Sequence, residues 1–383
     1  GILTTGGFPV HYLDNSATTP VLREAAERAF QVMTADFGNP SSQHKMGIEA
    51  AHILKESRET VSDALHVTPG EIIFTSCGTE STNMALWGAA RRRKKGHILT
   101  TAIEHAATLS CCKRLEQEGF SVTYLMPDSS GHISAADFAD ALQDNTILAS
   151  MMLVNNETGV RLPVEECGRI LKRRCPEALF HIDAVQGLFR VPLTPSKWAC
   201  DVMSISGHKI GAPKGIGALY LKKGLHLSPL LHGGGQENGL RSGTEALPNI
   251  AAFGTACQLR AASFAEDMRH VTALKESLLV GLRARLPWVL VNGDGEIPHV
   301  ISLSLPGCKS EVVLRILESD DIFVSAGSAC SRGKESHVLR AMGLDKARID
   351  SAIRVSFAPF NTDEDVKALL DGLEKASAAL KRG

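Results

Sequence analysis

The sequence has almost no net charge and no long apolar run. Its 41 Lys and Arg residues balance 42 Asp and Glu residues and leave a formal net charge of −1. A chain balanced in this way gives no electrostatic reason to expect nucleic acid or an anionic membrane as a partner. No apolar stretch approaches the roughly 20 residues that a membrane-spanning helix needs. We therefore expect neither direct nucleic-acid binding nor membrane insertion.

The cysteines follow no repeating pattern. The chain has nine, and the adjacent pair Cys111 and Cys112 does not have the spacing of metal ligands. This argues against a zinc site or a disulfide scaffold and favours a reducing compartment. The first seven residues lack the charged and apolar regions of a signal peptide. We expect a cytoplasmic protein without a metal site, in which most cysteines pack as small hydrophobic residues.

The chain does contain a regular alternation of strands and helices. Its 383 residues suffice for a large core and a second lobe. Helical patterns such as Pro163–Arg174 separate short β-rich runs from about residue 48 to 260. This alternation predicts a mainly parallel sheet covered on both faces. The predicted strands are Glu71–Thr75, His97–Thr101, Ile147–Val154, Leu179–Ile182, Val202–Ile205 and Gly217–Leu221.

The pattern changes after about residue 262 and predicts a smaller α+β lobe. A long helix, Ser263–Leu286, leads into further short elements. We expect this lobe to pack with the N-terminal segment. The remaining predicted elements are strands at Trp288–Val291, His299–Leu305 and Val355–Ala358 and helices at Ser310–Ser319 and Thr362–Lys381.

Polar residues follow several of these strands, where doubly wound sheets bind ligands. Ser76–Ser81 opens a helix with Gly and small hydroxyl residues, which fits either an anion site or an ordinary N-cap. Asp183 ends one strand, with Gln186 three residues later. Lys209 follows another strand, where burial lowers the pKa of an amine and favours its condensation with a carbonyl.

Each of these signals also has a simple structural explanation, such as a cap, a salt bridge or a loop lysine. Asn155–Gly159 reads as an Asn-rich turn, and His105 alone reads as a surface or core histidine. Together, however, they place an anion site, an acid, a lysine, a histidine and an asparagine at one sheet edge. Pyridoxal 5'-phosphate (PLP) needs such a set for its phosphate, its ring nitrogen and its aldehyde.

The chain resembles the NifS/IscS-type cysteine desulfurases, of the class V aminotransferase family and PLP fold type I. The resemblance covers essentially the whole chain. The matching segments are Tyr12–Pro20, Gly38–Ser42, Phe74–Glu80, Val154–Glu157, His181–Gln186, Ser206–Lys209, Arg241–Thr244 and Gly327–Cys330. The resemblance implies a large domain, residues 16–260, with a mainly parallel seven-stranded sheet. It implies a smaller α+β domain, residues 1–15 and 261–383, that carries the catalytic-cysteine loop.

The resemblance also implies roles for individual residues. Lys209 holds the cofactor covalently and moves the substrate Cα proton, while Asp183 keeps the pyridine nitrogen protonated. His105 stacks on the ring and moves a proton, and Gln186 contacts the ring hydroxyl. Gly78, Thr79, Ser206 and His208 bind the phosphate, which Thr244 reaches from the partner subunit of a homodimer. Asn156 and Arg354 hold the substrate carboxylate, and for Arg354 the planar guanidinium suits bidentate pairing.

Cys330 lies in a stretch of small residues, Ser325–Gly333. Taken alone it is an incidental free cysteine, but the family places its sulfur acceptor at this position. Arg332 and Lys334 favour its thiolate. The implied reaction converts L-cysteine to L-alanine and leaves the sulfur as a persulfide on Cys330, for transfer to an acceptor protein. That acceptor would serve iron–sulfur cluster assembly or the thio-modification of tRNA or DNA.

Other functions stay open at this point. A selenocysteine lyase shares the scaffold and the cysteine. A plain aminotransferase has no need of Cys330, and a non-catalytic scaffold has no need of Lys209 or Asp183. A nicotinamide enzyme is disfavoured because the glycines at 233–235 do not fit the dinucleotide fingerprint. The sequence around Cys330 resembles the long-loop desulfurases. The last residues, 378–383, lack the extended tail with which housekeeping members dock a scaffold protein, so the acceptor is not identified.

Overall fold

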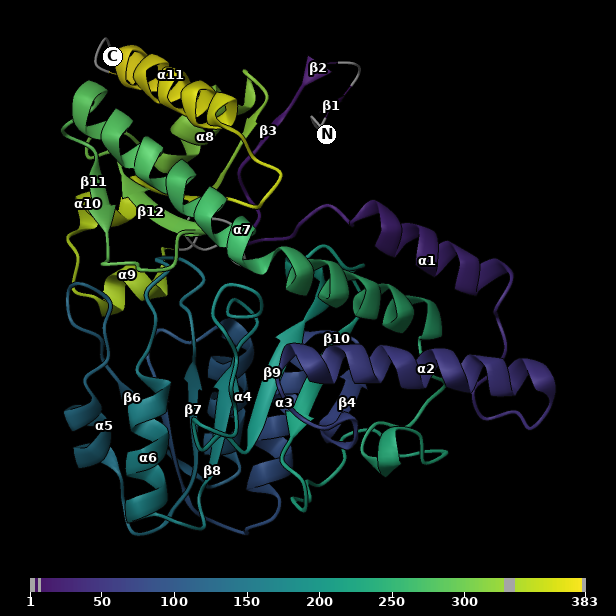
Figure 1. The fold of residues 1–383 in the computed structure, drawn as a ribbon. Coiled ribbons are helices and arrows are strands. Elements are labelled where there is room, and N and C mark those ends of the chain that lie inside the picture. Colours follow the sequence, from purple (N-terminus) through teal and green to yellow (C-terminus); the bar gives the residue numbers. More distant parts are fainter. Residues whose placement is uncertain (1–3, 6–7, 327–334, 381–383) are drawn as a thin grey trace.

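The computed structural model describes residues 4–5, 8–326 and 335–380, and it shows two domains joined by one long helix (Figure 1). The larger domain is built on a seven-stranded sheet with the order β4-β10-β9-β8-β7-β5-β6. Only β10 runs antiparallel to its neighbours. The predicted α/β fold with a mainly parallel seven-stranded sheet is therefore confirmed. Its strands are β4 (Ile72–Thr75), β5 (His97–Thr101), β6 (Ser121–Leu125), β7 (Thr146–Met152), β8 (Leu179–Asp183), β9 (Val202–Ser206) and β10 (Gly217–Leu221).

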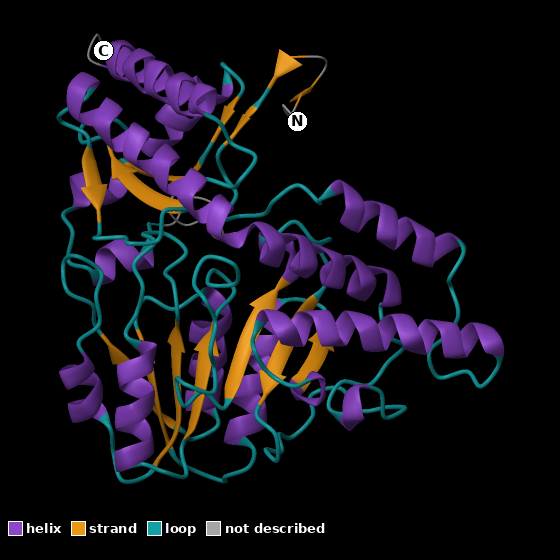
Figure 2. Cartoon of the chain, viewed as in Figure 1, coloured by secondary structure: helices purple, strands orange, loops and turns teal. Residues whose placement is uncertain are grey.

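Helices cover both faces of this sheet, as Figure 2 shows. Strands β4, β5, β8, β9 and β10 are buried along their whole length, which explains their continuous apolar sequences. Helices α3 (Gly78–Ala90) and α4 (Ala106–Gln117) pack on one face. The other face packs against α6 and the first half of α7. The other helices of this domain are α1 (Arg23–Thr34), α2 (Lys45–Ala64), α5 (Ala135–Ala141) and α6 (Val164–Arg174), with short 3-10 turns η1 (Pro69–Glu71), η2 (Gly207–Lys209) and η3 (Glu237–Gly239).

Helix α7 (Leu247–Arg285) connects the domains. It has 39 residues, packs against α1 and α2 in its first half, and contacts α11 in the smaller domain. The sequence predicted a helix from Ser263 only, so its start was placed too late. The missed half is rich in Ala, which blurs an amphipathic pattern, although Pro248 in its first turn is a typical start signal.

The smaller domain has an antiparallel four-stranded sheet with the order β11-β12-β15-β14. The N-terminal segment joins this domain, because β3 pairs with β13 in parallel. A separate apolar core, which includes Leu13 and Phe357, fills the domain. Its elements are β3 (His11–Tyr12), β11 (Leu290–Asn292), β12 (Val300–Ser304), α8 (Ser310–Glu318), β13 (Ile322–Phe323), β14 (Ser325–Ala326), α9 (His337–Ala341), α10 (Lys346–Asp350), β15 (Ala352–Ser356) and α11 (Asp363–Leu380), preceded by the pair β1 (Thr4–Thr5) and β2 (Phe8–Pro9).

Within the described residues, no helix combines the length and the apolar character that crossing a membrane requires. The described part of the chain also holds no cluster of three or more His, Cys, Asp or Glu side chains arranged to bind a metal ion.

Candidate active site between the two domains

The predicted polar residues meet where the parallel strands of the large sheet end. Asp183 closes β8, and Ser206 closes β9. Lys209 lies in η2 immediately after β9, and His105 caps α4 after β5. This edge faces the smaller domain (Figure 1). The site is thus assembled from loops of both domains around one sheet edge.

The start of α3 has the features of an anion-binding helix start. Its N-cap, Cys77, makes no side-chain capping bond, so the first N–H groups of the helix keep their donors available. Glu80, the acid of the first turn, is engaged elsewhere, by Ser76 N at 2.8 Å and Arg241 Nε at 2.9 Å. A Cβ on Gly78 would lie 2.7 Å from Val185 Cγ2 and 3.5 Å from Ser206 Cβ. Glycine therefore keeps the helix start close to the ends of β8 and β9.

Two side chains beside this helix start are suited to a phosphate. Ser206 Oγ is buried and has no hydrogen-bond partner among the described residues. His208 contacts Thr18 Oγ1 through Nδ1 at 3.1 Å. Burial, reinforced by the positive charges of Lys209 and Lys214, lowers the pKa of His208 to about 4. His208 is therefore neutral at physiological pH and offers a hydrogen bond rather than a charge.

Asp183 is a buried carboxyl group at the end of β8. Val185 N donates to its Oδ1 at 3.0 Å. Burial raises its pKa, while the nearby His105 and Lys209 act in the opposite direction. A buried carboxylate of this kind is stabilised by a protonated ring nitrogen, because an opposite charge favours its ionised form. Asp183 thus fits the pyridine nitrogen of PLP.

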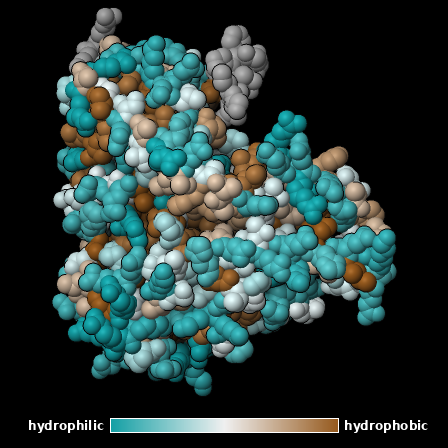
Figure 3. All heavy atoms as spheres, in the orientation of Figure 1, coloured by the Kyte–Doolittle hydropathy of each residue, from teal (hydrophilic) through white to brown (hydrophobic). Residues whose placement is uncertain are grey.

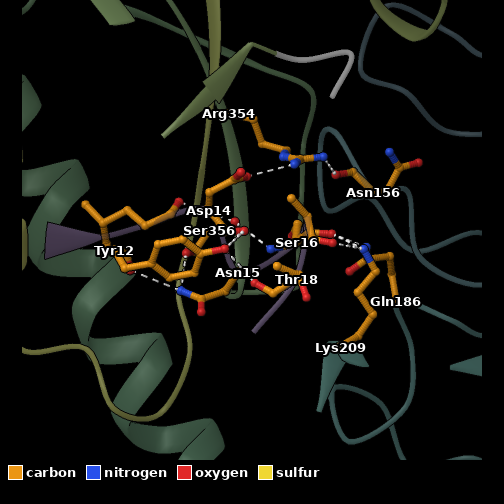
Figure 4. Close-up of polar contacts among 12 residues, drawn as sticks. Tyr12, Asp14, Asn15, Ser16, Thr18, Asn156, Gln186, Lys209, Arg354 and Ser356 are labelled. Carbon is orange, nitrogen blue, oxygen red and sulfur yellow. Dashed lines mark hydrogen bonds and ion pairs between the residues drawn. The ribbon is translucent and has the colours of Figure 1, made fainter. Parts of the chain in front are cut away.

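Lys209 is held against the N-terminal segment. Its Nζ donates to the carbonyl oxygens of Ser16 at 2.5 Å and Ala17 at 2.7 Å (Figure 4). Gln186 Nε2 donates to the same Ser16 carbonyl at 3.1 Å. Arg190 donates to Gln186 Oε1, and because a guanidinium cannot accept hydrogen bonds, this contact fixes the orientation of the amide. The Gln186 NH2 group is therefore the side of the amide available to an acceptor such as a ring oxygen.

Arg354, on β15, supplies a buried cation from the smaller domain. It is 2% exposed. Its Nη2 pairs with Asp14 Oδ1 at 3.0 Å, and its Nη1 donates to the Asn156 carbonyl at 3.1 Å (Figure 4). Its Nε has no hydrogen-bond partner in the described structure. The predicted pair of Asn156 and Arg354 is thus brought together, although here the backbone of Asn156, not its side chain, makes the contact.

His105 caps α4 and lies close to the acids of the site. Its Nδ1 accepts a hydrogen bond from Ala107 N at 3.1 Å, which in the neutral ring leaves the proton on Nε2. Its charge influences the pKa values of both Asp183 and Glu157.

The predicted phosphate-binding residues Thr79 and Thr244 lie on the surface. Cys330 lies outside the described residues.

Three acids with no predicted role belong to the same region. Asp14 neutralises Arg354, and Glu104 Oε1 accepts from Thr101 Oγ1 and Met152 N. Burial raises the pKa of Glu104 to about 8. Burial likewise raises the pKa of Glu157 to about 7, and its carboxylate accepts from Ser336 Oγ. Asp14 and Glu157 lie within segments that carried the family resemblance, yet only the fold shows what they contact.

Comparisons with known proteins give a consistent result. The family model described as aminotransferase class-V matches residues 11–369. A cysteine desulfurase IscS of Methanosarcina thermophila is 41% identical over 94% of this chain and 90% of its own length. A cysteine desulfurase of a Nostoc species is 40% identical over 94% of this chain and 91% of its own length.

Solved structures show the same similarity. A NifS-like protein superposes with a TM-score of 0.91 at 37% identity, over 96% of this chain and 99% of its own. DndA of Streptomyces lividans superposes with a TM-score of 0.76 at 38% identity, over 91% of this chain and 99% of its own. The sequence and the fold are thus similar to the same group of proteins along nearly the whole chain.

Proposed function

This chain belongs to the NifS/IscS-type cysteine desulfurases of the class V aminotransferase family, and we propose that the inter-domain site uses PLP to convert L-cysteine to L-alanine and passes the sulfur to Cys330. The matches to the family model and to named cysteine desulfurases confirm the family and the desulfurase function expected from the sequence. One observation carries the proposal for the site. The uncapped start of α3 lies beside Asp183 and Lys209, together with the buried Ser206 Oγ, which has no partner among the described residues. A phosphate, a pyridine nitrogen and an aldehyde require such a set.

The donor set fits the cofactor in charge as well as in shape. The helix start, Ser206 and neutral His208 would hold the phosphate, with Thr79 at the rim of this site. Asp183 would keep the ring nitrogen protonated, and the Gln186 amide would donate to the ring oxygen. When bound, PLP supplies an electron sink that stabilises negative charge at the substrate Cα.

Lys209 would link the cofactor and then act as a base. The Ser16 and Ala17 carbonyls hold its Nζ at the point where the two domains meet. The free Lys209 amine would stay within the site, where it would remove the substrate Cα proton and later return a proton. His105, with the proton on Nε2, is placed to assist this transfer.

Arg354 would bind the substrate carboxylate. Its guanidinium is buried, and Asp14 and Asn156 bond only to its two Nη atoms, while its Nε has no partner in the part of the chain that the structure describes. A carboxylate that pairs with it in bidentate fashion would be oriented with its Cα toward Lys209. Asn156 would support this contact from the adjacent turn.

Cys330 would receive the sulfur. Its thiolate attacks the sulfur of the substrate, an S–S bond forms while the substrate Cβ–S bond breaks, and the electron pair returns to the carbon skeleton, which leaves as alanine after protonation. The product on the enzyme is a persulfide at Cys330. An acceptor protein then takes this sulfur, for iron–sulfur cluster assembly or for thio-modification of tRNA or DNA, in the cytoplasm.

We further propose that the protein acts as a homodimer. Large apolar side chains lie exposed on α1, on α2 and in the loop between them, among them Phe30 and Phe37, each 64% exposed, and Met33 and Ile48. Figure 3 shows some hydrophobic side chains near the outer ends of these helices, besides further hydrophobic areas on the smaller domain and between the two domains. Apolar exposure of this kind marks an interface. Exposed Thr244 would then reach the phosphate site of the partner, and residues 16–260 would form the large domain of each subunit.

A paired assay tests the proposal. Alanine and sulfide released from L-cysteine, and alanine and selenide released from L-selenocysteine, are measured with wild-type protein and with Cys330→Ala. We expect cysteine turnover and persulfide labelling that depend on Cys330, with unchanged cofactor absorbance in the variant. Cys175→Ala, which removes a half-buried cysteine far from the site, is the control. Turnover of selenocysteine alone would instead identify a selenocysteine lyase.

A further inference from the structure

A small cavity lies behind Lys209, on the boundary between the two domains. Its volume is about 30 Å³, above the roughly 10–15 Å³ that one water molecule needs. The large domain contributes Arg190 and Lys209 to its lining, and α7 contributes Arg260 and Asp267. The smaller domain contributes His299, whose carbonyl accepts from Phe357 N at 2.9 Å. The cavity is thus formed only when the domains pack together.

The lining carries more positive than negative charge. Arg190, Arg260 and Lys209 are cations, and Asp267 is the only acid among the lining residues that the structure describes. Asp267 is already engaged, since its Oδ2 accepts from Arg260 Nη1 at 3.3 Å and from Ser263 Oγ at 2.8 Å. Burial and the charge of Arg354 lower the pKa of Arg190 to about 9, which still leaves it charged at neutral pH.

The two arginines retain donors that their contacts do not use. Arg190 is 5% exposed, and its bond to Gln186 Oε1 accounts for one of five N–H groups. Arg260 uses Nε for the Ile210 carbonyl at 3.1 Å and Nη1 for Asp267. His299 is also 5% exposed, and its Nδ1 has no partner among the described residues. Burial, with the neighbouring cations, lowers the pKa of His299, so this ring is neutral.

We propose that this cavity, the Arg190–Arg260 cavity, binds a small monovalent anion of about the size of chloride. A buried excess of positive charge is costly unless a counter-charge offsets it. The two guanidinium groups would supply charge-assisted hydrogen bonds, and the neutral His299 ring would supply one N–H. Because the lining comes from both domains, a bound anion would stabilise the closed packing of one domain on the other.

Two anions share this chemistry, namely chloride from the medium and hydrosulfide, the sulfur species that a desulfurase releases. The inference concerns binding and does not depend on the proposed residue roles at the active site. Failure of the assay with Cys330→Ala would leave it untouched, and the absence of an anion would leave the proposed function untouched.

Crystals of the holoenzyme grown in sodium bromide give the direct test. We expect an anomalous bromide peak in the cavity, within hydrogen-bond distance of Arg190, Arg260 or His299. Bromide found only at surface residues, with water in the cavity, would overturn the proposal.

Thermal unfolding gives the test in solution. Replacing gluconate by chloride at constant ionic strength should raise the Tm by roughly 2 °C through preferential binding to the folded state. Arg260→Met should abolish this increase. If this variant does not fold, His299→Phe, which keeps the size of the ring and removes its N–H, decides the question. Arg285→Met, which breaks a largely exposed ion pair with Asp371 and Glu374, should keep the increase.

An equal chloride effect in the wild type and in both cavity variants would contradict the proposal, as would no chloride effect in the wild type. Sodium hydrosulfide in place of chloride separates the two sources. A larger increase in Tm with hydrosulfide identifies the sulfur product as the preferred ligand, and a larger increase with chloride identifies the ion of the medium.

Discussion

The two domains hold their buried charges differently. On the large-domain side, Asp183 is buried at a strand end with a single backbone donor to Oδ1, and Ser206 Oγ has no partner among the described residues. On the smaller-domain side, Arg354 is equally buried but already paired with Asp14 at 3.0 Å. The first arrangement would be stabilised by the proposed cofactor, which would supply the missing charge. The second is neutral before the substrate arrives, as suits a ligand that enters and leaves in each cycle.

The largest effect on activity is expected at Lys209, which lies between the large-domain groups and Arg354. Lys209→Ala removes both the covalent link to the cofactor and the base, so alanine release from L-cysteine should fall by at least about 10³-fold. Lys214→Ala, which removes an exposed lysine in the next turn, should retain near wild-type activity. Comparable turnover in the two variants would remove Lys209 from the mechanism.

The second-largest effect is expected at Arg354, the buried cation that is paired with Asp14. Arg354→Lys keeps the charge but loses the planar fork, so kcat/KM for L-cysteine should fall by roughly 100- to 1,000-fold, mainly through KM. Steady-state kinetics measure this, and the cofactor absorbance should stay unchanged because the large-domain groups are intact. An unchanged KM with a lost cofactor spectrum would mean that Arg354 serves the cofactor and not the substrate.

Glu157 lies in the large domain and contacts Ser336 of the smaller domain. Its raised pKa leads us to expect that the stability of the protein depends on pH. Its folded pKa of about 7 lies above the ordinary glutamate value of 4.5, because burial disfavours the carboxylate. Between these values the folded state binds the proton and the unfolded state does not, so stability falls as pH rises and levels off above about pH 7.

Glu157→Gln keeps an acceptor for Ser336 and removes the ionisable group, so this loss of stability at higher pH should disappear. Urea unfolding at pH 5 and pH 8 should show the variant gaining about 3 kcal/mol relative to wild type over this interval. Glu335→Gln, at a fully exposed carboxylate, should show no such change. A variant whose relative stability does not depend on pH would disprove the raised pKa.

The smallest effect concerns the proposed phosphate site at the start of α3. The Cβ of Gly78→Ala would meet Val185 Cγ2 at 2.7 Å, so the helix start or the Val185 side chain must shift. We expect a loss of about 1 to 3 kcal/mol in unfolding free energy and a roughly 10-fold weaker affinity for PLP, measured by cofactor titration of the apoenzyme. Gly70→Ala is the control, since its Cβ would meet nothing within 4 Å. Equal affinity in the two variants would show that this site tolerates a methyl group.

Much of the large domain could be predicted because its strands are buried on both faces and therefore have continuous apolar sequences. Strand β6 was missed, since Ser121–Leu125 lies at the sheet edge, largely half-exposed, and has a mixed sequence. The polar residues that follow β8 and β9 were found for a related reason, namely that parallel strands end at one edge. Their individual roles rested on the family resemblance.

The sequence by itself therefore determined the fold class, the family and the residues at the ends of the large sheet, because each of these is written in a local pattern. Only the tertiary structure decided that Asp14 pairs with Arg354, 340 residues away, and that Arg190 orients Gln186. It also decided that Arg190, Arg260 and His299 line one cavity. The Asp14–Arg354 pair and the cavity join segments that lie far apart in the sequence. The energies of all these contacts depend on burial and distance, which the local sequence pattern does not specify.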